Sequence, residues 1–295
     1  MPVLATKVCE RLGKKPRSHI GWSQELVTRL ERWCPGRPIL LVGDGNFMAI
    51  ELVERCRAAA ATTLITRMRL DQALYAFPAP RPKGKRGRPA KKGPRQLRPK
   101  DRLSDPQTGW QRVTLTWYGK GERTVALATG VSLWYTPGHD PVPVRWVLVR
   151  PLPRDRQPFP PAALACTDPR LAAAEIVQRY LARWNIEVTF AEIRAHLGFE
   201  TQRHWSTRAV GRVTPCLFGL FSLVVLLAKR LHPEQLPGPE TSWYVKQEAT
   251  FSDALAAVRR HLWNPESVKF APETELCLIP RALLAGLQHV ASYST

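Results

Sequence analysis

The chain has 295 residues, with 44 lysines and arginines against 24 aspartates and glutamates, so its formal net charge is +20. Because 44% of the residues are hydrophobic and ten are tryptophan, a wholly disordered basic tail is excluded. The apolar content suffices for one large domain or two modest ones. This excess of positive charge predicts a polyanionic partner, nucleic acid first and an anionic membrane surface second, with simple solubility as the plainest alternative.

The cysteines and the apolar runs of the sequence indicate the cellular compartment of the protein. The six cysteines lie far apart, without a C-x-x-C pair or a Cys/His cluster at zinc spacing, which favours a reduced cytosolic setting. The first fifteen residues contain no apolar core of a secretory signal. The longest apolar run, residues 216–228, is shorter than the about 20 residues of a membrane span and predicts a buried core helix. We expect a cytoplasmic, nucleoid-associated protein.

The first seventy residues have the pattern of an α/β layer. Apolar residues recur at helical spacing in 22–33, and Pro35-Gly36 ends that helix. The apolar run 39–42 predicts a buried strand that ends at Asp44 and its flanking glycines. A helix over 47–61 and a strand over 62–66 follow. Strand, helix, strand in this order predicts a parallel pair.

A cationic segment then interrupts the pattern. No acidic residue occurs over 72–100, and 78–100 combines six prolines with ten lysines and arginines, which predicts an extended, mobile loop. Residues 86–89, Arg-Gly-Arg-Pro, resemble the core of an AT-hook, which lays two arginines in the minor groove of A·T tracts. A generic phosphate-binding loop is the broader alternative. On either interpretation we expect the loop to bind DNA through Arg86, Arg88, Lys91 and Lys92.

Strand patterns return at 112–118, 124–129, 132–135 and 142–150, as a β-rich insertion inside an α/β domain. Helical patterning resumes at Asp168-Pro169, interpreted as an N-cap and a proline at the first helical position. It continues, with an internal break left open, to Gly198 at the C′ position. Helices at 216–231 and 251–263 follow. We expect a partial core over 1–70, the loop and insertion over 71–163, two helices over 164–232 and a helical segment over 233–295.

The most informative pattern lies in this helical region. Tyr180, Arg183, Glu187 and Arg194 are spaced three, four and seven residues apart, so an α-helix places them along one stripe. A solvated ladder of salt bridges is the ordinary explanation of such a stripe. A carboxylate among cations also suits a metal ion that bridges to phosphate.

The spacing Y-x2-R-x3-E-x6-K/R resembles the Tyr-Arg-Glu-Lys signature of the DDE transposases of bacterial insertion sequences. Residues 39–52, ILLVGDGNFMAIEL, are similar to the segment around the family's second catalytic aspartate, and 183–205 to the segment around its catalytic glutamate. The resemblance covers roughly residues 20–265. It implies an RNase H-like core interrupted by a β-rich insertion, with a helical C-terminal segment.

The resemblance also implies a role for each matching residue. Asp44 and Glu187 correspond to metal-binding carboxylates that hold two Mg²⁺ (or Mn²⁺) ions, which activate the attacking oxygen and steady the leaving oxygen during phosphodiester cleavage and strand transfer. Tyr180, Arg183 and Arg194 correspond to residues that hold the phosphates of the transposon ends. Arg194 stands where most relatives have lysine and keeps the charge. The implied partners are the terminal repeats and the target DNA, and a homodimer in the synaptic complex is left open.

The chain departs from the family at one point. The family's first aspartate should lie well upstream of Asp44, yet no aspartate occurs between Met1 and Gly43. We expect an N-terminally truncated transposase that lacks the opening strands, with an unpaired sheet edge and poor solubility. The alternative is a catalytically dead DNA-binding remnant or an inhibitor of transposition; an RNA-associated protein ranks below both. Asp168 is explained as an N-cap, Glu192 as a solvated neighbour or a backup ligand, and the tryptophan that would stack on a displaced base is left open.

Overall fold

The computed structural model of the protein describes residues 18–58, 62–81, 87–118, 121–201, 206–236, 240–241, 244–245 and 249–262. The chain divides into two compact units, Arg17–Trp184 and a second one that contains the described residues from Asn185 onward. Each unit is described by itself. Arg86, one of the four cations expected to bind DNA through the loop, and Trp263 lie outside the described residues.

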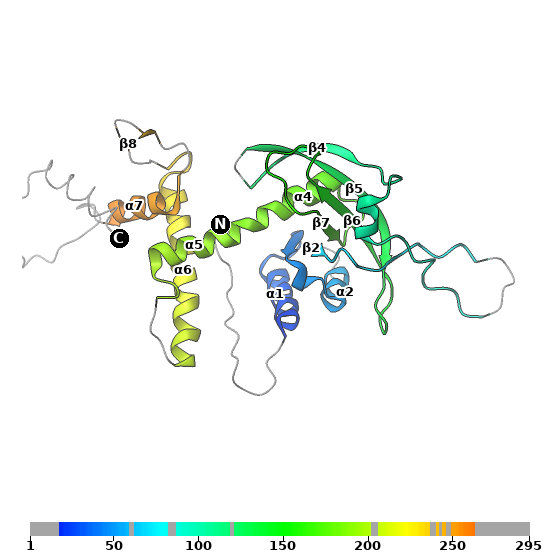
Figure 1. The fold of residues 1–295 in the computed structure, drawn as a ribbon. Helices are drawn as coiled ribbons and strands as arrows, with labels where there is room; N and C mark the ends of the chain where they lie inside the picture. Colours follow the sequence, from blue (N-terminus) through cyan, green and yellow to red (C-terminus); the bar gives the residue numbers. More distant parts are fainter. Residues whose placement is uncertain are drawn as a thin grey trace, which may run out of the picture. The chain divides into compact units, whose positions relative to one another are not determined.

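A seven-stranded sheet forms the centre of the first unit (Figure 1). The strand order is β1-β2-β7-β6-β5-β3, and β4 pairs with β5. Only β1 and β2 are parallel, as the sequence predicts, with Gly43 opposite Thr66. The other named pairs of this sheet are antiparallel. The strands are β1 (Ile39–Gly43), β2 (Thr62–Met68), β3 (Leu74–Tyr75), β4 (Gln111–Thr116), β5 (Glu122–Trp134), β6 (Val142–Arg150) and β7 (Ala162–Cys166).

Helices cover both faces of this sheet, so the unit is a mixed α/β layer structure. On one face lie α1 (His19–Trp33) and α2 (Ile50–Ala58), and on the other lies α4 (Ala173–Leu181). Successive residues of the central strands alternate between the two faces. The face under α2 buries Leu64, Met68, Val144, Trp146, Leu148, Ala163 and Ala165; the face under α4 buries Ile65, Val147, Val149, Leu164 and Cys166.

The predicted strands 124–129 and 132–135 are one continuous strand, β5, because Gly130 does not interrupt it. A Cβ atom at Gly130 would lie only 2.6 Å from Cζ2 of Trp146 on the neighbouring strand β6. Glycine is therefore required for the close approach of the indole, and here it marks a contact within the sheet rather than a turn.

The N-cap interpretation of Asp168 is wrong. Helix α4 begins at Ala173 with Ala172 as its N-cap, and no side chain caps it. Oδ1 of Asp168 instead accepts a hydrogen bond from the backbone N–H of Arg170 at 2.9 Å, as in an Asx turn. Hydrogen bonds from the Arg170 side chain and backbone lower the pKa of Asp168. The residue closes a turn five residues before the first residue of the helix.

The break in the helical region is real. Helix α4 ends at Leu181, a 3₁₀ turn η2 covers Ala182–Trp184, and α5 covers Asn185–Leu197. Gly198 follows with φ of +71°, in the left-handed conformation expected of a C′ glycine. Two shorter helical elements, η1 (Gly45–Phe47) and α3 (Pro99–Ser104), connect the strands of the first unit.

The second unit consists mainly of helices: α5, α6 (Thr207–Leu231) and α7 (Phe251–Leu262), with the short antiparallel pair β8 (Glu240–Thr241) and β9 (Tyr244–Val245). Its core joins Ile193 of α5 to residues of α6 and α7, where the rings of Phe221 and Phe251 stack with centroids 4.5 Å apart.

Helix α6 is only partly the buried core helix that its sequence predicts. One side is buried, but four leucines on the other side are 42–58% exposed, namely Leu220, Leu223, Leu226 and Leu227. By length and composition, Arg208–Leu231 would also suit a membrane span. One such helix is weak evidence for a membrane protein, and the aromatic side of α6 packs against α5 and α7.

Candidate functional site

Asp44 lies directly after β1, where the sequence places it. Its Oδ1 accepts a hydrogen bond from the N–H of Asn46 at 2.8 Å, so the carboxylate caps the 3₁₀ turn η1. The hydroxyl of Thr66, which is buried on β2 opposite Gly43, donates to the carbonyl oxygen of Asp44 at 2.5 Å. The parallel pair β1 and β2 therefore holds the backbone of Asp44 in place and leaves the second carboxylate oxygen, Oδ2, without a hydrogen bond to any described residue.

The four residues of the predicted stripe are divided between the two units. Tyr180 on α4 is half-buried against the sheet, and Cζ of Arg183, in η2, lies 5.9 Å from the centroid of the tyrosine ring. Glu187 and Arg194 are exposed on α5, seven residues and thus about two turns apart. The Nε of Arg194 donates to Glu200 at 2.6 Å, which raises the pKa of the arginine and lowers that of the glutamate.

The metal ions that the resemblance implies would need at least one further carboxylate beside Asp44 and Glu187. Among the described residues, no group of three or more histidine, cysteine, aspartate or glutamate side chains could hold a metal ion. Asp44 belongs to the first unit and Glu187 to the second. Glu192, considered as a backup ligand, pairs with His196 at 3.3 Å. The described residues of each unit, taken by itself, therefore offer no group of three ligands for a metal ion.

The described cations of the basic segment differ in their surroundings. Arg88 is exposed. Lys91 forms an ion pair with Asp140. The Nζ of Lys92 lies 3.6 Å from the ring centroid of Tyr75 and 3.8 Å from that of Tyr135. Two of the lysines expected to bind DNA thus have partners within the protein.

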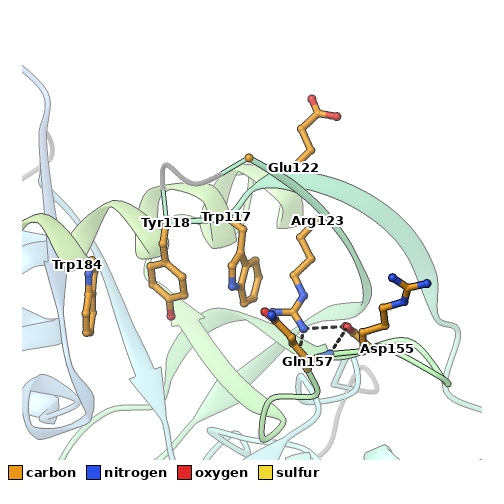
Figure 2. Close-up of a pocket in the computed structure, with 9 residues that line it drawn as sticks. Trp117, Tyr118, Glu122, Arg123, Asp155, Gln157 and Trp184 are labelled. Atoms are coloured by element: carbon orange, nitrogen blue, oxygen red, sulfur yellow. Dashed lines mark hydrogen bonds and ion pairs between the residues drawn. The ribbon is translucent and has the colours of Figure 1, made fainter. Parts of the chain in front are cut away.

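An aromatic pocket of about 630 Å³ lies in the first unit (Figure 2). The ring centroids of Trp117 and Tyr118 are 5.4 Å apart, and those of Tyr118 and Trp184 are 5.6 Å apart. Tyr118 and Trp184 remain 43% and 46% exposed, although large aromatic side chains are usually more buried. Tyr118 also has φ of +51°, a conformation that bulky residues rarely adopt.

A charged network forms the polar side of the pocket. Arg123 donates to the carboxylate of Asp155 at 2.8 Å and to the carbonyl oxygen of Gln157, and the N–H of Gln157 donates to Asp155 at 3.0 Å. These hydrogen bonds, that of Arg123 above all, lower the pKa of Asp155. Arg156 also lines the pocket, whereas Figure 2 shows the carboxylate of Glu122 directed away from it. The pocket thus combines exposed aromatic rings with arginine and amide groups.

Which tryptophan would stack on a displaced base was left open in the sequence analysis, and Tyr118 and Trp184 were not singled out there. Two signals were available: the Trp-Tyr pair at the end of the strand predicted at 112–118, and the tryptophan adjacent to Arg183. Neither signal shows that residues 66 positions apart in the sequence line one pocket.

Comparison with known protein families identifies the class to which this fold and these residues belong. The Transposase DDE domain family matches residues 13–211, which is more than half of the chain. The chain therefore belongs to the Transposase DDE domain family, of RNase H-like type, and its fold is consistent with that domain. Transposases act on DNA, which agrees with the net charge of +20. No curated protein gives a significant match to the chain.

Proposed function

We propose that the chain acts in DNA transposition as the transposase of a bacterial insertion sequence, binding the terminal repeats of its element and cutting and joining phosphodiester bonds there. The observation that carries this proposal is the family match over residues 13–211, because this stretch contains both Asp44 and Glu187. The charge of the protein supports a polyanionic partner.

Within this proposal, Tyr180, Arg183 and Arg194 contact the phosphates of the transposon ends. Asp44 and Glu187 are ligands for Mg²⁺ or Mn²⁺, ions that in a two-metal site activate the attacking oxygen and stabilise the leaving one. Among the described residues, no group of three metal-ligating side chains gathers around either carboxylate. A homodimer in the synaptic complex is part of the proposal.

A second candidate function is DNA binding without catalysis, as a remnant or an inhibitor of transposition. It is favoured by the absence of a three-ligand group among the described residues. The two candidates agree on the partner and differ only in the chemistry.

Cleavage of a labelled terminal-repeat duplex in the presence of Mg²⁺ or Mn²⁺ separates the two candidates. A catalytic chain should lose cleavage in Glu187→Gln and in Asp44→Asn and keep its affinity for DNA. Glu192→Gln is the matched control on the same helix, because it removes a carboxylate that pairs with His196. Binding without cleavage, unaffected by Glu187→Gln, would favour the non-catalytic candidate. Failure to bind duplex DNA would contradict both.

We further propose that the aromatic pocket accepts a nucleobase displaced from the transposon end. The pocket volume lies within the range of about 300–1,000 Å³ typical of ligand sites. Trp184 and Tyr118 offer exposed ring faces on which a base can stack, and Arg156 and Gln157 offer hydrogen-bond donors to its edge. This proposal assigns the stacking role to Trp184 and Tyr118 rather than to the buried Trp134 and Trp146.

An end duplex that carries 2-aminopurine at the displaced position tests this role. Trp184→Ala should abolish the fluorescence change on binding and weaken affinity by about 5- to 150-fold, since stacking contributes about 1–3 kcal/mol per base. Trp33→Ala is the control, because Trp33 is also exposed but lies on α1 outside the pocket. An equal loss in both variants would contradict a specific stacking site.

A further inference from the structure

Part of the cationic segment is attached to the sheet. We call residues 87–98 the basic arm. The N–H of Gly93 donates to the carbonyl oxygen of Ala76 at 2.8 Å, and the N–H of Ala76 donates to that of Pro94 at 2.9 Å. The N–H of Gln96 donates to the carbonyl oxygen of Leu74 at 2.8 Å. These hydrogen bonds run along β3, where Tyr75 and Arg95 form a bridge, so the arm continues the edge of the sheet.

The side chain of Lys92 adds a second attachment. Its ammonium lies within 4 Å of the centroids of two tyrosine rings, Tyr75 on β3 and Tyr135 directly after β5. The two rings meet edge to face with centroids 6.1 Å apart. Lys92 and both tyrosines are half-buried. An ammonium between two rings is attracted by both quadrupoles, and partial desolvation strengthens that attraction.

A third attachment lies in the turn between β5 and β6. The ammonium of Lys91 pairs with the carboxylate of Asp140. The hydrogen bond from Lys91, its positive charge and that of Arg88 all lower the pKa of Asp140. Both halves of this contact are largely exposed, so the contribution of the pair to stability is small.

Two arginines of the arm, Arg88 and Arg95, differ from Lys91 and Lys92 in their contacts. Arg88 and Arg95 are exposed and form no hydrogen bond or ion pair with any other described residue. Their guanidinium groups remain available for phosphate, whereas Lys91 and Lys92 are already engaged. Of the five cations of the arm, Lys91 and Lys92 attach it, Arg98 pairs with Asp101, and Arg88 and Arg95 face solvent.

We propose that Lys92 is a positioning residue for DNA binding: with Tyr75 and Tyr135 it clamps the basic arm to the sheet, so that Arg88 and Arg95 are presented to the DNA backbone in a fixed place. The clamp lowers the conformational entropy that the arm loses on binding. This inference rests on the proposed function for its partner, DNA. It replaces the expectation that Lys92 itself contacts phosphate.

Gly93 offers an independent way to break the clamp without removing a charge. A Cβ atom at this position would lie 2.5 Å from the carbonyl oxygen of Phe77 and 3.0 Å from that of Ala76. Both are backbone atoms and cannot rotate away, so Gly93→Ala must displace the arm from β3.

Two measurements on the full chain test the proposal: hydrogen exchange of the arm without DNA, and the affinity for duplex DNA as a function of salt. In Lys92→Gln the protection of the Gly93 and Ala76 amides should fall about tenfold, in line with one or two lost cation–π contacts. Lys92→Arg should retain most of it. The Gln96 amide serves as an internal reference, because the Gln96 side chain is held separately by Ser132 at 2.6 Å.

The DNA measurement distinguishes positioning from phosphate contact. Arg95→Gln should lower the slope of log affinity against log salt by about 0.9, the value of one phosphate contact, and leave amide protection unchanged. Lys92→Gln and Gly93→Ala should both weaken binding with the slope unchanged. A lower slope and unchanged protection in Lys92→Gln would overturn the proposal. Unchanged protection in both Lys92→Gln and Gly93→Ala would also overturn it. Absence of DNA binding by the unaltered chain would refute the proposed function, while the exchange data would still decide the clamp.

Discussion

Thr66 connects the turn that carries Asp44 to the neighbouring strand. Its hydroxyl is buried and donates to the carbonyl oxygen of Asp44, which also accepts a longer bond, 3.2 Å, from the N–H of Phe47. Thr66→Val keeps the shape of the side chain and removes the donor. Because the carbonyl retains one partner, we expect a loss of about 1 kcal/mol in the free energy of unfolding.

Urea denaturation measures this loss, with Thr63→Val on the same strand as the control. The Thr63 side chain makes no hydrogen bond to any other described residue, so its substitution should change stability by less than about 0.5 kcal/mol. Equal effects in the two variants would show that the bond to Asp44 contributes nothing.

The carboxyl group of Asp155, which lines the aromatic pocket, should make the stability of the protein depend on pH. Hydrogen bonds from Arg123 and Gln157 lower its pKa in the folded protein. A lowered folded-state pKa stabilises the protein above the ordinary carboxyl pKa of about 3.9, and this stabilisation is lost as pH falls through the lowered value. The stability difference between the unaltered protein and Asp155→Asn should therefore be constant at neutral pH and shrink below about pH 4.

Thermal unfolding from pH 7 to pH 3 checks this expectation. In an Arg123→Gln background, Asp155→Asn should have a smaller and less pH-dependent effect, because the main cause of the pKa shift is gone. A difference that grows on acidification would reverse the sign of the argument.

Only part of the candidate site was predictable at the scale of single residues. The sequence placed Asp44 at a strand end, because an apolar run stops at a glycine-flanked aspartate. It did not predict the surroundings of Lys92, since Tyr75 and Tyr135 are 60 residues apart and meet only through the pairing of β3 with β5. The net charge of the sequence indicates the class of partner. Which cations remain available to contact that partner depends on how the strands pair in the folded protein.

The secondary-structure elements, like the residues of the site, were predictable only in part. Strands β1, β2 and β6 are rich in isoleucine, valine, leucine or threonine, residues that fit a pleated surface, and all three were predicted. Strand β7, with the sequence AALAC, was missed because alanine has little strand preference of its own. It forms because β2 and β6 flank it and the small side chains lie under the helices on both faces. Tertiary pairing created an element that local propensity does not specify.

Helix α6 leads to a prediction at this scale, because its two sides should respond differently to substitution. Phe221 is 3% exposed and stacks on Phe251, so Phe221→Ala should cost about 3–5 kcal/mol. Leu223 is 58% exposed, and Leu223→Gln should change stability by less than about 0.5 kcal/mol and raise solubility. Calorimetry and solubility measurements test the pair. A large destabilisation by Leu223→Gln would mean that this side of the helix is covered in the folded protein.

At the scale of the whole molecule, the sheet ends on an apolar edge. β1 has only one partner strand among the described residues, and none of its five residues is charged. Edge strands of this kind invite pairing with another chain, and proteins usually protect them with charges or proline. The expected poor solubility stays a prediction, and the edge is its physical basis. The sequence predicts the α/β class. It does not predict that the core strands and the strands of the β-rich insertion form a single sheet.

The whole-molecule charge predicts DNA binding that does not depend on a metal ion. The charge of +20 makes phosphate neutralisation the dominant contribution to affinity, so log affinity should fall linearly with log salt, by about 0.9 for each phosphate contacted. Because this contribution comes from lysine and arginine side chains, replacing Mg²⁺ by a chelator at constant ionic strength should leave the dissociation constant unchanged. Fluorescence anisotropy with a labelled duplex measures both quantities. A loss of binding on chelation would show that a metal ion organises the DNA-binding surface, and a salt-independent affinity would contradict an electrostatic one.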